Sequence, residues 1–320
     1  MKILYPSENI VCITQLKHLD GVYDLLKEFG YITYVPDITK EELKSTLFET
    51  KTKYLFTNPN KQPFILDEEV LKDSNIKVIN TCSTGTNHID MEYCKENNIE
   101  VWHLAKDYEL INQLPSTAEH AFGLMLSLIR KIPMSFHSVR DGNWDYEPYI
   151  GRQLKGLTVG IIGYGRLGKM METYCHAFGM TVKIHDPYEG YDDLDLVLRE
   201  SDVISLHVHV TGKTVGMING KTISKMEKKP YLINTSRGEI VYEKKVIEAI
   251  EEGKLSGYAT DVITDEFGNI HNSKLIEFSM NPTNNVIITP HVGGMTWEGQ
   301  TKAYKWAINK FWDIQKIDDI

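Results

Sequence analysis

Three short stretches in the second half of the sequence carry polar residues just after apolar runs. Arg237 follows "YLINTS", Asp261 and Glu266 lie in "GYATDVITDE", and His291 closes "NVIITPH". Ligands of open α/β sheets bind at the ends of such strands. Singly, each has an ordinary interpretation as a surface charge, a capping acid or a loop histidine. Placed in one sheet beside a dinucleotide site, they predict hydride transfer.

A dinucleotide site is predicted by the stretch "GIIGYGRLG" at residues 160–168. It follows an apolar strand and opens an amphipathic helix, the context that gives this glycine spacing its meaning. Gly163 permits the tight turn, Gly165 lets the backbone approach a pyrophosphate, and Gly168 lets the helix pack on the strand. The N–H groups at the helix start, including those of Arg166 and Leu167, suit a phosphate.

Asp186 ends the next expected strand, "TVKIHD". An acid there accepts hydrogen bonds from the adenosine ribose and repels a 2′-phosphate. No arginine stands beside it, since Pro187 and Tyr188 follow. NAD is therefore favoured over NADP, the alternative being that Asp186 is only a turn residue before proline.

The elements that must position these residues form two series of alternating strands and helices, which predicts parallel sheets covered by helices. The first series has expected strands at residues 2–5, 31–35, 53–57, 77–81 and 100–103. The second has them at residues 157–163, 181–186, 203–208, 231–234, 257–262 and 286–289. A terminal amphipathic helix is expected over residues 297–314.

Between the two series, Ser116 and Glu119 have the spacing of a capping box that opens the apolar run "AFGLMLSLI". Because this helix is apolar nearly all round, it needs cover on more than one side. Burial in a core and packing at a subunit interface both explain the pattern.

Composition narrows the class of protein. A chain of 320 residues predicts two domains. The formal charge of −9 argues against a nucleic-acid-binding surface. The four cysteines have no metal-ligand spacing, so a reducing compartment is expected and no metal is. No signal-peptide core or membrane-length apolar run is present, so a cytoplasmic location without membrane contact is expected.

Residues 151–294 resemble the D-isomer-specific 2-hydroxyacid dehydrogenase family. The likeness is carried by "GRQLKGLTVGIIGYGRLGKMMETYCHAFGM", "SDVISLHVHVTGKT", "INTSRGEIVYE", "GYATDV" and "NVIITPHVGG". Weaker likeness in "STGTNHID" and "STAEHAFGLMLSLIRKIP" extends it over most of the chain.

The resemblance implies a role for each polar residue. Arg237 corresponds to the arginine that binds the 2-keto acid, and its planar fork suits that task. His291 corresponds to the acid/base at the carbonyl oxygen, and Glu266 to its carboxylate partner, whose negative charge favours imidazolium. Asp261 corresponds to the residue that binds the nicotinamide carboxamide. The substrate carboxylate is expected on backbone N–H groups of Ser83, Thr84 and Gly85. The residues expected to bind the cofactor are Gly163, Gly165, Arg166, Leu167, Gly168, Asp186, Thr235 and Asp261.

The resemblance also implies the architecture: a Rossmann NAD-binding domain, residues 102–292, inserted into a flavodoxin-like substrate domain, residues 1–101 and 293–320. Two chain crossings, near Trp102 and Gly293, would form a hinge that closes residues 83–85 over the nicotinamide. A homodimer is expected around residues 116–131 and the arm that follows to Trp144.

Departures from the family pattern concern the substrate more than the reaction. Asn87 stands where aspartate is frequent, His209 and Phe267 where proline is frequent, and a solvent-facing position is favoured for His209. The loop "TNPNKQPF" offers only Lys61 for a phosphate, which disfavours 3-phosphoglycerate. The chain ends soon after the terminal helix, so the serine-sensing domain of some phosphoglycerate dehydrogenases is expected to be absent.

Several substrates and functions stay open. D-lactate, D-glycerate or hydroxypyruvate, glyoxylate and branched 2-hydroxy acids all remain candidates. The rival from another class is an NAD-sensing, corepressor-like binding protein of the same fold. A formate dehydrogenase is a further enzyme alternative, although those chains are usually longer.

Overall fold

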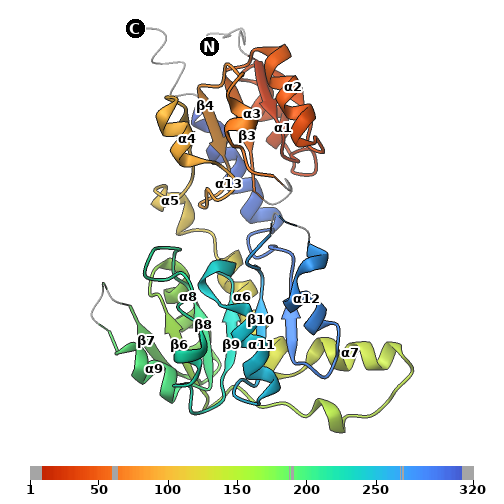
Figure 1. Cartoon of the computed structure of the whole chain (residues 1–320), viewed down its shortest axis with the longest axis vertical. Helices are drawn as coiled ribbons and strands as arrows, with labels where there is room; N and C mark the ends of the chain where they lie inside the picture. The colour runs from red at the N-terminus through yellow and green to blue at the C-terminus, as the bar shows by residue number, and fades with distance from the viewer. Residues whose placement is uncertain are drawn as a thin grey trace. The chain divides into compact units, whose positions relative to one another are not determined.

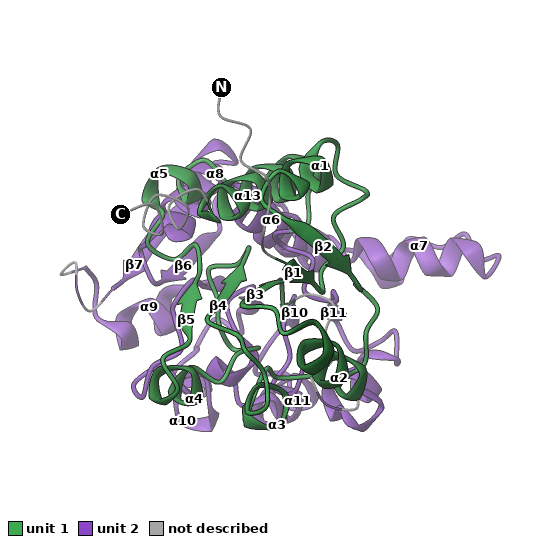
Figure 2. Ribbon diagram, turned by 90° about the horizontal axis from the view of Figure 1, so that it is seen from above, with its two compact units in different colours: residues 1–114, 295–320 green, residues 115–294 purple. Residues whose placement is uncertain are grey.

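The chain divides into two compact units, residues 1–114 with 295–320 (unit 1) and residues 115–294 (unit 2) (Figure 2). This computed structural model describes residues 9–59, 64–186, 188, 191–266, 268 and 270–311. The crossings lie at Leu114/Pro115 and Gly294/Met295, whereas the sequence placed them near Trp102 and Gly293. Residues 102–114 belong to unit 1 because their apolar side chains, Leu104, Leu110 and Ile111, are buried in its core.

Unit 1 is built on a five-stranded parallel sheet in the order β2-β1-β3-β4-β5 (Figure 1). This is the flavodoxin-like order. The strands are β1 Asn9–Cys12, β2 Tyr31–Tyr34, β3 Tyr54–Thr57, β4 Val78–Thr81 and β5 Glu100–Trp102. Strand β1 was not predicted, and the strand expected at residues 2–5 lies outside the described residues.

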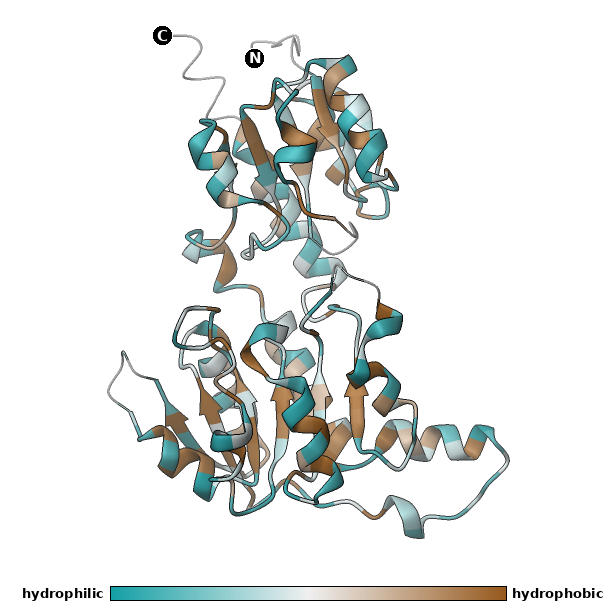
Figure 3. Cartoon of the chain, viewed as in Figure 1, coloured by the Kyte–Doolittle hydropathy of each residue, from teal (hydrophilic) through white to brown (hydrophobic). Residues whose placement is uncertain are grey.

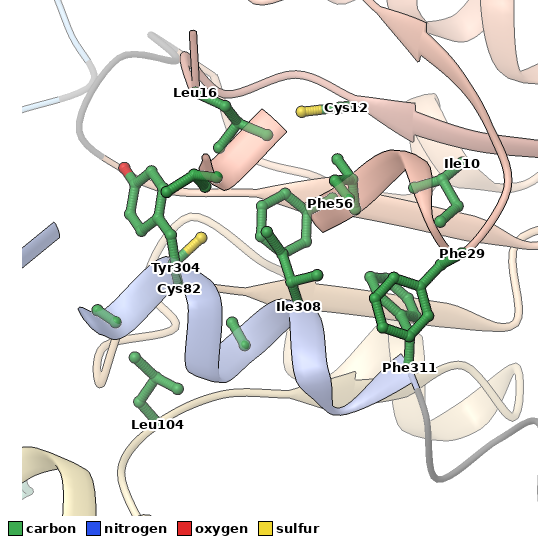
Figure 4. Close-up of a cluster of buried hydrophobic side chains, with 14 of the residues drawn as sticks. Ile10, Cys12, Leu16, Phe29, Phe56, Cys82, Leu104, Tyr304, Ile308 and Phe311 are labelled. Atoms are coloured by element: carbon green, nitrogen blue, oxygen red, sulfur yellow. The ribbon is translucent and has the colours of Figure 1, made fainter. Parts of the chain in front are cut away.

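Helix α13, Trp297–Asn309, returns the end of the chain to unit 1. Tyr304, Ala307 and Ile308 from this helix, with Phe311 beyond it, are buried among side chains of the sheet (Figure 4). The Phe311 ring lies 5.8–6.2 Å from those of Phe29, Tyr54, Phe56 and Trp102. The other helices of unit 1 are α1 Val22–Lys27, α2 Lys40–Thr50, α3 Glu68–Leu71, α4 Met91–Glu96 and α5 Tyr108–Ile111.

Unit 2 contains a six-stranded parallel sheet in the order β11-β10-β9-β8-β6-β7. The strands are β6 Thr158–Ile162, β7 Thr181–His185, β8 Val203–Leu206, β9 Tyr231–Asn234, β10 Gly257–Thr260 and β11 Val286–Ile288. The first strand, β6, lies between β7 and β8, so the strand order reverses there. Ligands of open α/β sheets bind beyond the carboxyl ends of the strands at such a point. Two doubly wound parallel-sheet units confirm the predicted fold class.

Helices cover both sheets; hydrophilic residues lie along most of these helices, whereas the strands are largely hydrophobic (Figure 3). Those of unit 2 are α6 Ser116–Ile129, α7 Ile132–Arg140, α8 Arg166–Ala177, α9 Leu194–Glu200, α10 Gly220–Ile223, α11 Glu243–Glu251 and α12 Lys274–Ser279. Short 3₁₀ turns lie at Glu147–Tyr149, Gly238–Ile240 and Ile270–Asn272. Among the described residues, no helix combines the length and apolarity that a membrane crossing requires.

Helix α6 differs from its prediction at its start. Pro115 occupies the N-cap position without a side-chain hydrogen bond, so the capping box predicted for Ser116 and Glu119 is wrong. Ser116 is already helical and cannot act as the cap. The apolar face of α6 is buried in the unit 2 core, where Ala121, Met125 and Leu128 are fully covered.

Candidate active site

In the turn between β6 and α8, Gly163 and Gly168 allow the backbone to pack closely, whereas Gly165 borders open space. Gly163 has φ of 96°, a conformation that favours glycine. A Cβ on Gly168 would lie 2.2 Å from the carbonyl oxygen of Gly163, so α8 can approach the turn only with glycine there. A Cβ on Gly165 would meet no atom within 4 Å. Space therefore remains beside Gly165, in front of the N-terminus of α8, where a phosphate is stabilised.

Asp186, directly after β7, braces this turn. Its Oδ2 accepts the backbone N–H of Tyr164 at 2.8 Å, and its Oδ1 accepts that of Tyr188 at 2.9 Å. Each carboxylate oxygen has about two acceptor positions, so each retains capacity for a ribose hydroxyl. The position thus joins the glycine turn to the expected ribose site.

Two polar groups at the next strand ends are buried without a hydrogen-bond partner among the described residues. They are Nδ1 of His207, just after β8, and Oγ1 of Thr235, just after β9. The other ring nitrogen of His207 lies 2.9 Å from Oγ of Ser205. Burial lowers the pKa of His207 to about 4, so its imidazole is neutral at pH 7. Unpartnered buried polar groups at a switch point, beside an open glycine turn, fit a polar ligand such as a dinucleotide.

Arg237 lies on the loop after β9, and Asn234 at the end of that strand holds the loop by hydrogen bonds. The Asn234 side chain donates to the Arg237 carbonyl at 2.9 Å and accepts the Ser236 N–H at 3.0 Å. The guanidinium Nη1 donates to the Ser236 carbonyl at 2.6 Å. A Cβ on Gly238 would lie 2.1 Å from the carbonyl carbon of Ile263, so this loop packs directly on the segment after β10.

His291 and Glu266 form an ion-pair geometry within unit 2. Nδ1 of His291 lies 2.6 Å from Oε2 of Glu266, and both side chains are largely covered. The Glu266 segment is held in turn by Glu243 on α11, whose Oε1 accepts the Thr264 N–H at 2.8 Å. Burial raises the pKa of Glu243, although the bonds from Thr264 oppose the shift. The two residues that the resemblance paired are therefore brought together.

Asp261 is 2% exposed and fixes the segment that carries His291. Its carboxylate accepts the Thr289 hydroxyl at 2.5 Å and the N–H groups of Val292 and Gly293 at 2.9 and 2.7 Å. Its carbonyl accepts the His291 N–H at 2.9 Å. Burial alone would raise the pKa of Asp261, but the hydrogen bonds that it accepts hold it below the ordinary value. This anchoring role was not anticipated; the nicotinamide contact expected of Asp261 remains a prediction.

The loop expected to receive the substrate carboxylate follows β4 in unit 1. The Gly85 N–H donates to Oγ of Ser83 at 3.0 Å, and the Ser83 carbonyl accepts the Leu104 N–H at 2.8 Å. Thr84 is exposed on this loop.

The departures from the family pattern are placed as follows. The prediction that His209 faces solvent is confirmed, because its side chain is exposed. Asn87 Oδ1 is buried without a hydrogen-bond partner among the described residues. Lys61 and Phe267 lie outside those residues. Within the same residues, no group of three or more histidine, cysteine, aspartate or glutamate side chains could hold a metal ion.

Four residues of the site were missed by sequence reasoning: Asn234, Glu243, Thr289 and His120. The first two lie inside "INTSRGEIVYE", a stretch already singled out, so closer attention to its buried polar residues could have found them. His120 lies on α6, and no local signal connects it to the segment after β11.

Comparison with known proteins gives a family match over the part of the chain that contains the site residues of unit 2. The family model described as D-isomer specific 2-hydroxyacid dehydrogenase, NAD binding domain, matches residues 122–293. The hydroxypyruvate reductase of Thermotoga maritima is 34% identical over 241 residues, which are 72% of this chain and 74% of the relative. The crystal structure of D-lactate dehydrogenase from Aquifex aeolicus, complexed with NAD and lactic acid, has a TM-score of 0.79 at 30% identity. The match covers 97% of this chain and 96% of the chain in that crystal structure.

Some relatives are much longer than this chain. The D-3-phosphoglycerate dehydrogenase of Methanocaldococcus jannaschii is 32% identical over 304 residues, which are 92% of this chain but 55% of the relative. The chain spans about half the length of the D-3-phosphoglycerate dehydrogenases that it matches, between 43% and 55%.

Proposed function

Because the chain belongs to the D-isomer specific 2-hydroxyacid dehydrogenase family, we propose that it transfers a hydride between NAD(H) and a small D-2-hydroxy acid or 2-keto acid. Unit 2 is the NAD-binding domain of the family, and NAD is its cofactor. The observation that carries the proposed reaction is the His291–Glu266 pair, 2.6 Å apart on the sheet that carries the glycine turn.

The cofactor would be held at the strand ends of unit 2. Its pyrophosphate suits the space beside Gly165 and the N–H groups at the start of α8, at Arg166 and Leu167. Asp186 would bind the ribose, and Thr235 offers a buried hydroxyl. When bound, NADH supplies the hydride that reduces C2 of the keto acid.

His291 would supply the proton for the carbonyl oxygen. Since Glu266 engages Nδ1, the proton is delivered from Nε2. The carboxylate fixes the orientation of the ring and sets which nitrogen faces the substrate. In the oxidative direction, the neutral ring accepts the hydroxyl proton.

Arg237 would bind the substrate carboxylate and carbonyl oxygen through its guanidinium fork. Its present bond to the Ser236 carbonyl uses one donor, and guanidinium has five. Ser83, Thr84 and Gly85 are proposed to bind the same carboxylate through backbone N–H groups. The Gly85 N–H is engaged by Ser83, so this contact rests chiefly on the N–H groups of Ser83 and Thr84.

A panel of 2-keto acids with NADH tests this function and identifies the substrate by kcat/KM. Pyruvate, hydroxypyruvate, glyoxylate, branched and aromatic 2-keto acids, and 3-phosphohydroxypyruvate would be compared. We expect turnover of at least one unphosphorylated acid, with weaker use of the phosphorylated one and preference for NADH over NADPH. Tight NADPH binding with weak NADH binding would overturn the role of Asp186.

The corepressor-like alternative is not favoured, because the arginine, histidine and glutamate expected of the enzyme are all present and anchored. It would gain support if NADH bound tightly while every acid in the panel went unreduced.

We propose a homodimer formed through α6 and the arm that follows to Trp144, and we extend this arm to residue 150 because Tyr146 and Ile150 are also exposed. This arm exposes Ile132, Phe136, Val139, Trp144, Tyr146 and Ile150, with Trp144 91% exposed. Such a concentration of exposed large apolar side chains is typical of an association surface, and a second copy buries both arms at once. Light scattering should give twice the chain mass, and Phe136→Glu with Trp144→Ala should give monomer. A wild-type monomer would contradict the dimer.

A cytoplasmic location is also proposed. All four cysteines are buried free thiols, which a reducing compartment maintains. Cell fractionation would test it.

A further inference from the structure

His120 on α6 makes polar contacts with the segment that carries His291. Its Nε2 lies 2.9 Å from Oγ1 of Thr289 and 3.3 Å from Oδ1 of Asp261. The side chain of His120 is 24% exposed, and the three groups all lie within unit 2. His120 therefore reaches Thr289, on the segment that carries His291, and Asp261, whose hydrogen bonds hold that segment.

The oxygen positions determine where the protons lie. Thr289 Oγ1 is 2.5 Å from Asp261 Oδ1, and two oxygens at that distance require the hydroxyl proton between them. The threonine hydroxyl thus donates to the carboxylate, and its lone pair accepts from His120. This fixes the His120 proton on Nε2 and orders a relay from His120 through Thr289 to Asp261.

The far end of this relay holds the His291 backbone in an unusual conformation. His291 has φ of 53°, which costs a non-glycine residue about 1 kcal/mol or more. Its N–H is held by the Asp261 carbonyl, and the next two N–H groups are held by the Asp261 carboxylate. The fit around this carboxylate is tight: a Cβ on Gly293 would lie 2.9 Å from Asp261 Oδ2 and 3.6 Å from Cδ2 of His120.

We propose that His120 is a positioning residue for the reaction described above, acting through Thr289 and Asp261 to keep His291 aligned on Glu266. The inference rests on the proposed function for its effect on turnover, but not for its geometry. It assigns α6 a part in catalysis in addition to its packing in the core.

Two substitutions separate positioning from simple structural support. His120→Ala removes the Nε2–H donor, whereas His120→Gln keeps an amide N–H donor on a side chain of similar reach. We expect His120→Ala to lower kcat by roughly 10- to 100-fold, the cost of a misplaced reacting group. The KM of the keto acid should change by less than about twofold, because Arg237 is held independently by Asn234. His120→Gln should recover most of kcat. His18→Ala, an exposed position of unit 1, serves as the matched control and should leave kcat unchanged.

A readout without turnover keeps this inference distinct from the proposed function. The short bond from His291 to Glu266 should give a downfield imidazole proton resonance in NMR spectra, assigned by its loss in Glu266→Gln. We expect the resonance to be broadened or lost in His120→Ala and retained in His120→Gln. If wild type reduces no acid but the resonance follows this pattern, the positioning role stands and only the reaction fails.

Three results would overturn the proposal. Full kcat in His120→Ala would show that the contact does not matter. Equal loss in His120→Ala and His120→Gln, with equally lowered thermal unfolding midpoints, would indicate helix packing alone. An unchanged His291 resonance in His120→Ala would show that the relay does not reach the catalytic histidine.

Discussion

The two sheets of this chain follow the same parallel pattern, yet they use the polar residues at their strand ends differently. In unit 1 these residues bind other parts of their own unit. Asn58 donates to the Tyr304 hydroxyl and Asn80 to the Ala307 carbonyl, each at 2.7 Å. Both bonds attach α13 to the sheet, so the strand ends of unit 1 stabilise the fold.

In unit 2 the corresponding positions are open or belong to the candidate site. Gly165 faces space, while His207 and Thr235 each keep a buried atom that bonds no described residue. The loops that carry Arg237, Glu266 and His291 are held by hydrogen bonds. Their partners are Asn234, Glu243 and Asp261, respectively. The difference shows that strand-end polarity alone does not indicate a ligand site. An unpartnered buried atom alone does not indicate one either, since Asn80 Oδ1 in unit 1 also lacks a hydrogen-bond partner among the described residues. What distinguishes unit 2 is that its unpartnered atoms lie at the same strand ends as an open glycine turn.

The largest expected effect is on turnover. His291→Asn should lower kcat by about 10²- to 10⁴-fold, because it removes the proposed general acid. Asparagine tolerates the left-handed backbone that His291 adopts, so the loop should keep its conformation. Steady-state kinetics with the best acid of the panel measures the effect, and circular dichroism checks the fold. Retained kcat would mean that the site of unit 2 is wrongly assigned.

The glycine turn offers a matched pair of substitutions. Gly168→Ala places a Cβ 2.2 Å from a backbone oxygen and should lower the free energy of unfolding by about 1–3 kcal/mol. Gly165→Ala meets no atom within 4 Å, so it should leave stability unchanged within about 0.5 kcal/mol. It should nevertheless weaken NADH binding, because its methyl group enters the proposed pyrophosphate space. Denaturant unfolding and NADH titration test the pair; tight NADH binding by Gly165→Ala would contradict that placement.

Unit 1 should respond in stability alone. Tyr304→Phe removes the acceptor of the Asn58 amide and should cost about 1–2 kcal/mol of unfolding free energy. Since this bond belongs to the fold of unit 1, kcat and NADH affinity should stay at wild-type values. A large loss of kcat at unchanged stability would contradict the claim that the strand-end residues of unit 1 serve only the fold.

The smallest effect is a pH dependence that originates in unit 2. The pKa of His207 is lowered to about 4, from about 6.5 in an unfolded chain. Its contribution to stability is therefore complete above pH 6.5 and is lost as pH falls toward 4. Between pH 7 and 5.5, wild type should lose about 1 kcal/mol more unfolding free energy than His207→Asn. Parallel losses in urea titrations would show that His207 is not buried neutral.

Local patterns predicted the glycine turn well, because strand, turn and helix are contiguous in the sequence and each glycine has a steric reason. The same local reasoning failed where a short segment carried little signal. Strand β1 is only the run from Asn9 to Cys12, and periodicity cannot distinguish four residues from a loop. The capping box at Ser116 failed because Pro115 before it already occupies the cap position.

Long-range contacts explain the other misses. His120 and Thr289 are 169 positions apart, so no spacing rule connects them. Asp261 was interpreted from the resemblance as a cofactor ligand, and only the structure shows how many of its bonds serve the loop of His291. The boundary near Trp102 was misplaced because Leu104, Leu110 and Ile111 do not reveal which core they enter.

The return of α13 to unit 1 has a consequence for synthesis on the ribosome. Unit 2 is continuous in the chain, so its sheet is complete once Gly294 has emerged. The unit 1 core includes Tyr304, Ile308 and Phe311, which are translated after the whole of unit 2. Domains fold as units during synthesis. Residues 1–114 therefore cannot complete their core until translation has passed unit 2, and part of their apolar sheet stays uncovered until then.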